Sequence, residues 1–394
     1  MTKKPDAPAI RFKGFSDAWE QRKFSEITFL SGEKNRENLP LESYSITNES
    51  GFVPQDEKFE NGGTMREANK RMYYIVSPNS FAYNPARINV GSIGYQNTGK
   101  NVIVSSLYEI FKTSDDVDDR LLWHWFKSPD FQKLIWQLQE GGVRLYFYYD
   151  KLCMGEVSLP SLEEQRKIGK FFDTLDNLIT LHQRKFEKLT NVKKSMLEKM
   201  FPQNGCSYPE IRFKGFTDAW EQRKVSELAE KTYGGGTPST LNEAYWDGDI
   251  PWIQSSDVVD GRLFGVVPRK RITQYGLNNS ATQLVPKNSI AIITRVGVGK
   301  LAFMPYSYAT SQDFLSLSKL NAEPLFTVYA CYKKLQSELN AVQGTSIKGI
   351  TKDELLAKTV MVPQYAEQQQ IGAFLSQLDN LITLHQRKHL RLHP

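Results

Sequence analysis

The chain has 394 residues, of which 40% are hydrophobic and 24% are charged, a composition that excludes a disordered protein and favours two or three domains. No apolar run reaches the roughly 18 residues of a membrane span, and no apolar segment follows the N-terminal lysines as in a signal peptide. The net charge of +6 is too small to identify a partner. The odd number of widely spaced cysteines, Cys153, Cys206 and Cys331, excludes a disulfide framework and favours the cytoplasm.

An internal repeat organises the chain. Residues 10–23 read IRFKGFSDAWEQRK and residues 211–224 read IRFKGFTDAWEQRK, while LDNLITLHQRK occurs unchanged at 175–185 and 378–388. Chance does not produce two such pairs at nearly the same offset. The sequence therefore predicts two fused copies of one unit, each made of an arm, a domain and a helix.

Between arm and helix, the two copies predict the same order of elements. Alternating strand patterns at 104–111 and 310–317 are followed by amphipathic helical segments at 118–142 and 323–344, which stop near glycine. These elements predict one mixed α/β fold in both copies. The predicted boundaries are 1–158 for the first arm and domain, 159–205 for the first helix, 206–361 for the second arm and domain, and 362–394 for the second helix.

The domain surfaces differ more than their predicted folds. Residues 24–158 carry 14 basic and 18 acidic side chains, a net charge of −4, whereas residues 225–361 carry 14 and 12, a net charge of +2. A uniformly basic nucleic-acid binder is therefore excluded. Two copies that agree at their ends and differ in their middles suggest a shared frame that holds two different binding surfaces.

A long helix is predicted after each domain. Ser161-Leu162-Glu163-Glu164 is typical of a capping box, and apolar residues then recur at steps of three and four up to Phe201. About 38 residues at 1.5 Å each give a rod of roughly 57 Å, and the second copy runs from about 366 to 392. Each apolar seam needs a partner, so we expect an antiparallel coiled coil with a pseudo-twofold. The residues expected in it are Leu175, Leu178, His182, Leu189, Leu378, Leu381 and His385.

Two motifs resemble fragments of catalytic sites, and both are incomplete. Asn84-Pro85-Ala86-Arg87 lacks the second proline and the aromatic residue of the amino-methyltransferase motif. Gly297-Val298-Gly299-Lys300 lacks the first glycine and the final Ser or Thr of a phosphate-binding loop. It is therefore interpreted as a turn between strands in preference to a phosphate site, with a close approach of the backbone to DNA as the third alternative. The triple glycine at 234–236 is read as a flexible turn, and Trp246 as a core residue. The sequence predicts neither a catalytic residue nor a metal site.

Taken together, these residues resemble the specificity (S) subunit of type I restriction-modification systems, the HsdS family. The resemblance rests on the repeated arm, on a Pro-x2–3-Glu-Gln opening of each helix, on LDNLITLHQRK, and on GGGTPST followed by YWDGDIPWIQ. It covers the chain from residue 10 to about residue 392. The last helix, which ends HLRLHP, is shorter than the first.

The resemblance implies a non-catalytic protein that recognises double-stranded DNA. Each target recognition domain would read one half of a bipartite, asymmetric site, and the helices would fix the gap and dock two modification (M) subunits. Those subunits would bind S-adenosylmethionine and methylate adenine, and restriction (R) subunits would use ATP and Mg in the bacterial cytoplasm. The chain itself would bind no cofactor and no membrane. The alternatives are a stand-alone adenine methyltransferase and a coiled-coil scaffold without DNA contact.

In such a protein, lysine and arginine contact phosphates, whereas polar loop residues contact base edges. Core packing is the alternative for Tyr83 and Tyr95, and solvated charge is the alternative for Arg66 and Arg71. The candidates in the first domain are Arg66, Arg71, Tyr83, Asn84, Arg87, Asn89, Tyr95, Lys100 and Arg144. Those in the second domain are Thr237, Gln254, Ser255, Arg295, Lys300, Gln312, Thr345, Ser346 and Lys348.

Overall fold

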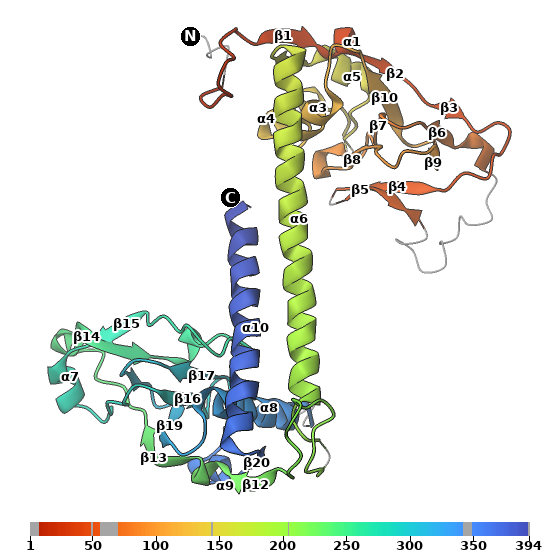
Figure 1. Ribbon diagram of the computed structural model, residues 1–394. Coiled ribbons are helices and arrows are strands. Elements are labelled where there is room, and N and C mark those ends of the chain that lie inside the picture. The colour runs from red at the N-terminus through yellow and green to blue at the C-terminus, as the bar shows by residue number, and fades with distance from the viewer. Residues whose placement is uncertain are drawn as a thin grey trace. The chain divides into compact units, whose positions relative to one another are not determined.

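The computed structural model describes residues 8–48, 50–55, 70–142, 145–203, 205–341 and 349–392. Contacts divide the chain into two compact units, which are residues 1–178 and 179–394 (Figure 1). Helix α6 (Leu162–Lys199) is continuous through this boundary, so its first part belongs to unit 1 and its second part to unit 2. None of the helices within the described ranges is long and apolar enough to cross a membrane.

Unit 1 is built around a four-stranded antiparallel sheet in the order β2-β10-β7-β8. Its strands are β2 (Thr28–Leu30), β10 (Glu109–Thr113), β7 (Phe81–Tyr83) and β8 (Ile93–Tyr95). The other strands are β1 (Glu20–Lys23), β3 (Glu33–Lys34), β4 (Tyr44–Thr47), β5 (Gly51–Pro54), β6 (Tyr74–Val76), β9 (Val102–Val104) and β11 (Glu156–Leu159). Its shorter helices are α1 (Phe24–Ile27), α3 (Asp119–Trp125), α4 (Pro129–Leu138) and α5 (Tyr149–Met154).

Aromatic side chains fill the core between this sheet and helices α3 and α4. Phe81 stacks on Phe111 at 5.1 Å between ring centroids, and Phe126 meets both rings edge to face. The helical segment predicted at 118–142 is two helices, because Ser128 caps α4 at the point where Pro129 begins a new helix. The strand predicted at 104–111 is likewise interrupted by a turn between β9 and β10.

Unit 2 repeats the architecture of unit 1. Its four-stranded antiparallel sheet has the order β13-β19-β16-β17, with β13 (Ala229–Gly234), β19 (Phe314–Leu320), β16 (Ser289–Ile293) and β17 (Leu301–Met304) in the places of β2, β10, β7 and β8. The agreement confirms two similar domains of mixed α/β fold. The other elements are β12 (Glu221–Lys224), β14 (Trp246–Ile253), β15 (Lys270–Ile272), β18 (Ala309–Thr310), β20 (Thr359–Val362), α7 (Gln274–Asn278), α8 (Pro324–Ala341), α9 (Lys352–Ala357) and α10 (Tyr365–Leu392).

The repeated arm is anchored to the start of each long helix by the same buried ion pair. In unit 1 the Nε and Nη2 atoms of Arg11 donate to the two carboxylate oxygens of Glu164, both at 2.7 Å. In unit 2 the same atoms of Arg212 donate to Glu367, both at 2.8 Å. Both glutamates are fully buried. The predicted capping box would have the Glu164 carboxylate accept from the backbone at the start of the helix. This prediction is wrong, because both carboxylate oxygens accept from Arg11 of the arm instead.

The glutamine that follows each anchoring glutamate ties the long helix to the domain. The Nε2 atom of Gln165 donates 2.9 Å to the carbonyl of Pro160, and its Oε1 atom accepts from the N–H of Asp118, which begins α3. Gln368 repeats both bonds in unit 2, with the carbonyl of its own upstream proline and the N–H of Glu323. The repeated Glu-Gln dipeptide thus joins arm, domain and helix.

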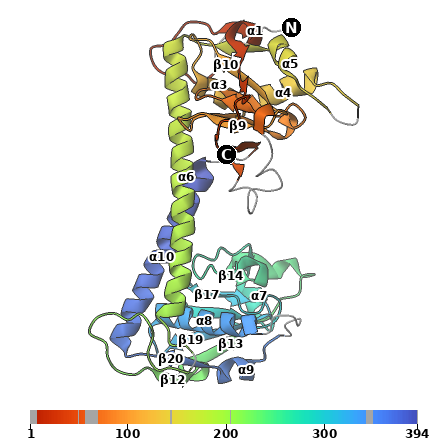
Figure 2. The same cartoon turned by 90° about the vertical axis from the view of Figure 1, so that its right-hand side faces the viewer.

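The second part of α6 packs antiparallel on α10 within unit 2 (Figures 1 and 2). The twin residues His182 and His385 face each other with their Nδ1 atoms 2.9 Å apart, as expected where a twofold relates two copies of a helix. Leu189 and Leu378 pack in the unit 2 core, so the predicted seam is confirmed there. Leu381 is 43% exposed, and the predicted seam residues Leu175 and Leu178 belong to unit 1.

Candidate nucleic-acid interface

Loops from several strands of unit 2 meet at one edge of its sheet. The N–H of Gly236 bonds to the carbonyl of Thr310, and the N–H of Ser311 bonds to the carbonyl of Ile253, both at 2.9 Å. The N–H of Thr294, after β16, bonds to the carbonyl of Asp313 at 2.8 Å. These bonds bring five sequence candidates onto neighbouring loops. We call this set the strand-end edge of unit 2: Thr237, Gln254, Ser255, Arg295 and Gln312.

The strand-end edge exposes polar side chains on a closely packed backbone. Thr237, Arg295 and Gln312 are exposed. The glycine run is not the flexible turn that the sequence suggested, because a Cβ on Gly235 would lie 1.7 Å from the carbonyl oxygen of Ser311. Only glycine fits so close an approach. The indole N–H of Trp252 also donates to the carbonyl of Gly236 at 3.0 Å, which holds the glycine segment 234–236 in place.

The turn between β16 and β17 lies beside this edge. Gly297 and Gly299 have φ angles of +90° and +93°, a backbone conformation that favours glycine, so the strand-turn interpretation is confirmed. Lys300, at the end of the turn, is half-buried. The chain returns to the edge at Ile350, whose N–H bonds to the carbonyl of Thr294 at 2.7 Å. The candidates Thr345, Ser346 and Lys348 lie outside the described residues.

The corresponding sheet edge of unit 1 holds a hollow of about 830 Å³. Residues at the ends of β2 and β7 and at the start of β10 line this hollow. The strand-end edge of unit 2 has the equivalent position, because it follows β16, the counterpart of β7, and precedes β19, the counterpart of β10. Two sequence candidates, Asn84 and Arg87, line this hollow, and Asn89 is exposed two residues further on. We call it the tyrosine-lined hollow after its aromatic residues, Tyr74, Tyr108, Tyr146 and Tyr148.

Other candidates of the first domain lie away from the hollow. Tyr95 ends β8 at the opposite edge of the sheet, where its hydroxyl donates 3.0 Å to Asn79 and 3.2 Å to Asp119, and burial raises its pKa. Lys100 forms an ion pair with Glu42. The packing interpretation therefore fits Tyr95 better than a DNA contact does.

Tyr83 is fully buried in the aromatic core, and burial raises its pKa well above the ordinary value. Packing, the alternative considered for it, is its role in this structure. Arg71 is exposed in a short 3-10 helix (Lys70–Met72), three residues before Tyr74 of the tyrosine-lined hollow. Arg66 and Arg144 lie outside the described residues.

Tyr146 and Tyr148, which line the hollow, are not among the sequence candidates. Their rings stack at 5.6 Å between centroids and only 2° between planes, and Phe147 between them is fully buried. This alternation of outward tyrosine and inward phenylalanine is visible in the sequence LYFYY.

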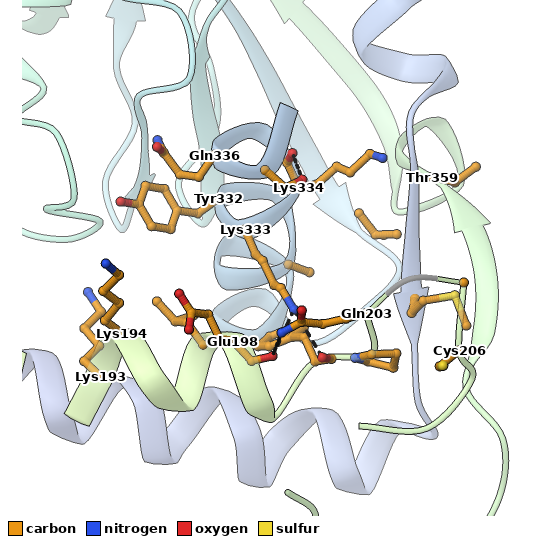
Figure 3. A pocket seen from close by; sticks show the side chains of 18 of the residues that line it. Lys193, Lys194, Glu198, Gln203, Cys206, Tyr332, Lys333, Lys334, Gln336 and Thr359 are labelled. Atoms are coloured by element: carbon orange, nitrogen blue, oxygen red, sulfur yellow. Dashed lines mark hydrogen bonds between the residues drawn. The ribbon is translucent and has the colours of Figure 1, made fainter. Parts of the chain in front are cut away.

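Several lysines line a separate hollow of about 850 Å³ in unit 2 (Figure 3). Three of them, Lys193, Lys333 and Lys334, form contacts within the unit. The Nζ atom of Lys333 donates 3.1 Å to the carbonyl of Phe201 and 3.3 Å to that of Glu198, at the end of α6 (Figure 3). Its burial lowers the pKa of Lys333 to about 8. Lys193 and Lys334 form ion pairs with carboxylates. Lys333 thus stabilises the C-terminal end of α6, where carbonyl groups lack helical partners.

Comparison with known proteins identifies the family. The family model described as type I restriction modification DNA specificity domain matches residues 19–191 and again residues 217–393. The chain belongs to this family. The two matches fall on the two copies of the internal repeat, so each copy by itself has the features of a DNA specificity domain.

Individual relatives agree with this assignment. The chain is 31% identical over 170 residues to the type I restriction enzyme MjaIX specificity subunit of Methanocaldococcus jannaschii, covering 41% of this chain and 38% of the relative. It is 31% identical over 169 residues to the EcoR124I/EcoR124II specificity subunit of Escherichia coli, covering 41% of each chain. The chain therefore spans about two fifths of these relatives. The crystal structure of the S subunit of the type I system from M. genitalium shares the fold, with a TM-score of 0.59 at 12% identity over 98% of this chain and 95% of that one.

Proposed function

We propose that the chain is the non-catalytic DNA-reading subunit of a type I restriction-modification complex. Each unit reads one half of a bipartite, asymmetric site on double-stranded DNA. The long helices dock two modification subunits, and restriction subunits join the complex. S-adenosylmethionine and ATP with Mg are bound by these partners in the bacterial cytoplasm, and this chain binds no cofactor.

One observation carries the proposal, namely a repeated frame with two unlike edges. The sheet order, the Arg–Glu anchor and the Gln bonds are the same in both units. At equivalent sheet edges, however, unit 1 presents a tyrosine-lined hollow, whereas unit 2 presents close-packed glycine beside polar side chains. A frame that holds two different surfaces suits a protein that recognises two different short sequences.

The charge of the domains is consistent with help from partners. The first domain carries a net charge of −4, and phosphate contacts by lysine and arginine supply much of the affinity for DNA. The chain alone should therefore bind DNA weakly. The modification subunits would supply much of the phosphate contact, while the two units of this chain supply the base contacts.

The catalytic part of the proposal is tested with the pure chain. We expect no transfer of methyl groups from labelled S-adenosylmethionine to DNA, and transfer once the modification subunits of the same system are added. Methylation by the chain free of modification subunits would support the stand-alone methyltransferase. Failure to co-purify with any modification subunit would support the scaffold alternative.

The modular part is tested by exchanging residues 225–361 for the domain of another member of the family. Because the frame is the same in both units, the exchanged chain should still assemble. Sequencing of methylated adenines across the host genome should then show one half-site changed and the other retained. A change in both half-sites would mean that the two units do not read independently.

A further inference from the structure

The tyrosine-lined hollow presents aromatic rings that the core of unit 1 does not use. Tyr148 is 49% exposed, and its ring stacks on that of Tyr146. Rings of this size usually lie buried in a core, where each contributes a large apolar area. Two adjacent tyrosines left facing a hollow are therefore available for an external ligand.

The backbone holds this pair in place. The N–H of Tyr146 donates 2.7 Å to the carbonyl of Glu140, and the N–H of Glu140 donates 2.9 Å in return. The N–H of Phe147 bonds to the carbonyl of Pro85 at 3.1 Å, and its ring is fully buried. These bonds place the tyrosines directly beside the turn that carries Asn84 and Arg87. A base-reading surface needs such fixed geometry, because its contacts must match the spacing of base edges.

The groups around the hollow match the chemistry of base edges. Asn84 and the phenol hydroxyls offer both donors and acceptors, while Arg87 offers donors only. The carboxylate of Glu109 lines the hollow and can accept from an exocyclic amino group of cytosine or adenine. Leu107, which is 70% exposed, offers apolar contact of the kind that a thymine methyl group makes.

The position of the hollow supplies the remaining argument. The hollow lies at the sheet edge of unit 1 that is equivalent to the strand-end edge of unit 2, where Thr237, Gln254 and Gln312 lie. The first domain is also acidic overall, so uncharged contacts must contribute more of its DNA recognition than in a basic domain.

We infer that the Tyr146–Tyr148 pair, together with Asn84 and Arg87, is the base-contacting surface of unit 1 and sets the sequence of one half-site. The inference rests on the proposed function. It assigns the specificity of unit 1 to this edge of its sheet and not to the opposite edge, where Tyr95 and Lys100 lie.

The test compares single variants in the full chain, each assembled with the modification subunits. The probe is a library of duplex DNA with random half-sites, and methylated molecules are sequenced. Tyr148→Ala should relax or change one half-site and reduce methylation of its original sequence by roughly 5- to 100-fold, the range expected for loss of a good base contact. Tyr148→Phe keeps the ring and should lose less. Tyr95→Phe, on the opposite edge, is the matched control and should leave both half-sites unchanged.

Each outcome has a distinct meaning. If Tyr148→Ala and Tyr146→Ala both leave the two half-sites and the methylation rate within twofold of the unchanged chain, the inference is overturned. If Tyr95→Phe instead alters a half-site, the opposite edge reads the DNA, and the inference also fails. A wild-type complex that methylates no bipartite sequence would refute the proposed function itself. Thermal melting identifies a variant that does not fold. If an alanine variant is unfolded, the half-site sequences methylated by Tyr148→Phe and Arg87→Gln test the inference instead.

Discussion

At the scale of single residues, the two Arg–Glu anchors join the repeated arm to each long helix through a buried carboxylate. Glu164 and Glu367 are fully buried, and a buried carboxylate is costly unless it is paired and hydrogen-bonded. Each receives two parallel bonds from an arginine of the repeated arm, a geometry with both strength and direction. The arm is therefore part of the folded unit, and its near-identity in the two copies has a structural reason.

We predict that Arg212→Ala destabilises the protein by about 3 kcal/mol, because it leaves the buried carboxylate of Glu367 without its partner. Urea unfolding of the full chain measures the change. Arg223→Ala is the matched control, since Arg223 pairs with the exposed Glu221 at the surface and should cost less than about 1 kcal/mol. Equal decreases in the free energy of unfolding of the two variants would show that the buried anchor contributes no more to stability than a surface ion pair.

The sequence predicted the positions of these residues but not their partners. The repeat shows that Arg11 and Arg212 recur, yet each bonds to a glutamate more than 150 residues away in the chain. Hydrophobic periodicity reports which face of an element is buried and carries no information on such distant pairs. For the same reason the sequence does not show that the hydroxyl of Tyr95, a candidate DNA contact, bonds to Asp119 within the domain.

At the scale of elements, the best sequence prediction was the pairing of the long helices, because the apolar steps of three and four are a strong and local signal. Within unit 2 the pairing adds polar contacts that the pattern does not reveal. The Nζ atom of Lys193 meets Asp379 at 2.5 Å, and the hydroxyl of Tyr329 donates 2.6 Å to the other oxygen of that carboxylate. The limits of the shorter helices were harder to predict, since a single capping serine and a proline divide α3 from α4.

We expect the contact between His182 and His385 to make the helix pair sensitive to pH. Burial, followed by the charges of His182, Lys185 and Lys388, lowers the pKa of His385 below its ordinary value of about 6.5. The folded protein therefore binds a proton at this site less readily than the unfolded chain does. The stability of the pair is fully present above about pH 6.5 and should fall as the pH drops through the lowered pKa.

We expect the thermal midpoint of the full chain to decrease when the pH is lowered from 7.5 to 5.5. The decrease should be smaller in His385→Gln, because glutamine cannot take up the proton. The midpoint is followed by circular dichroism. His124→Gln is the control, because His124 bonds to the carboxylate of Asp173 at 3.1 Å and lies in unit 1. Identical pH dependence in the unchanged chain and in His385→Gln would contradict this prediction.

At the scale of the whole molecule, duplication separates two requirements that a single domain would have to meet at once. If the proposed function holds, the frame must stay constant so that partners recognise it, whereas the two sheet edges must vary so that new sequences are recognised. The copies agree in the arm, in the Glu-Gln dipeptide and in LDNLITLHQRK, and they differ around the sheet edges. The repeat alone predicted the shared fold of the two units. It could not show which residues contact DNA, because the exposed polar residues follow no periodicity.

If the long helices also set the gap between the half-sites, the gap should change with helix length. α6 runs without interruption from Leu162 to Lys199 and contributes residues to both units. One extra heptad at matched places in α6 and α10 preserves the apolar seam and adds roughly 10 Å at 1.5 Å per residue. Along B-DNA this length corresponds to about three base pairs.

The lengthened chain should keep both half-site sequences and prefer a gap longer by roughly two to four base pairs. Its affinity should fall, because three base pairs also rotate the second half-site by about a third of a turn, and the added heptad supplies little compensating twist. Selection of methylated molecules from a library with random spacer lengths measures the preferred gap. Inserting five residues in place of seven is the control, since it rotates the apolar residues by roughly 140° away from the seam and should abolish assembly. A heptad variant with full activity and an unchanged gap would mean that the helices hold the subunits together without measuring distance along the DNA.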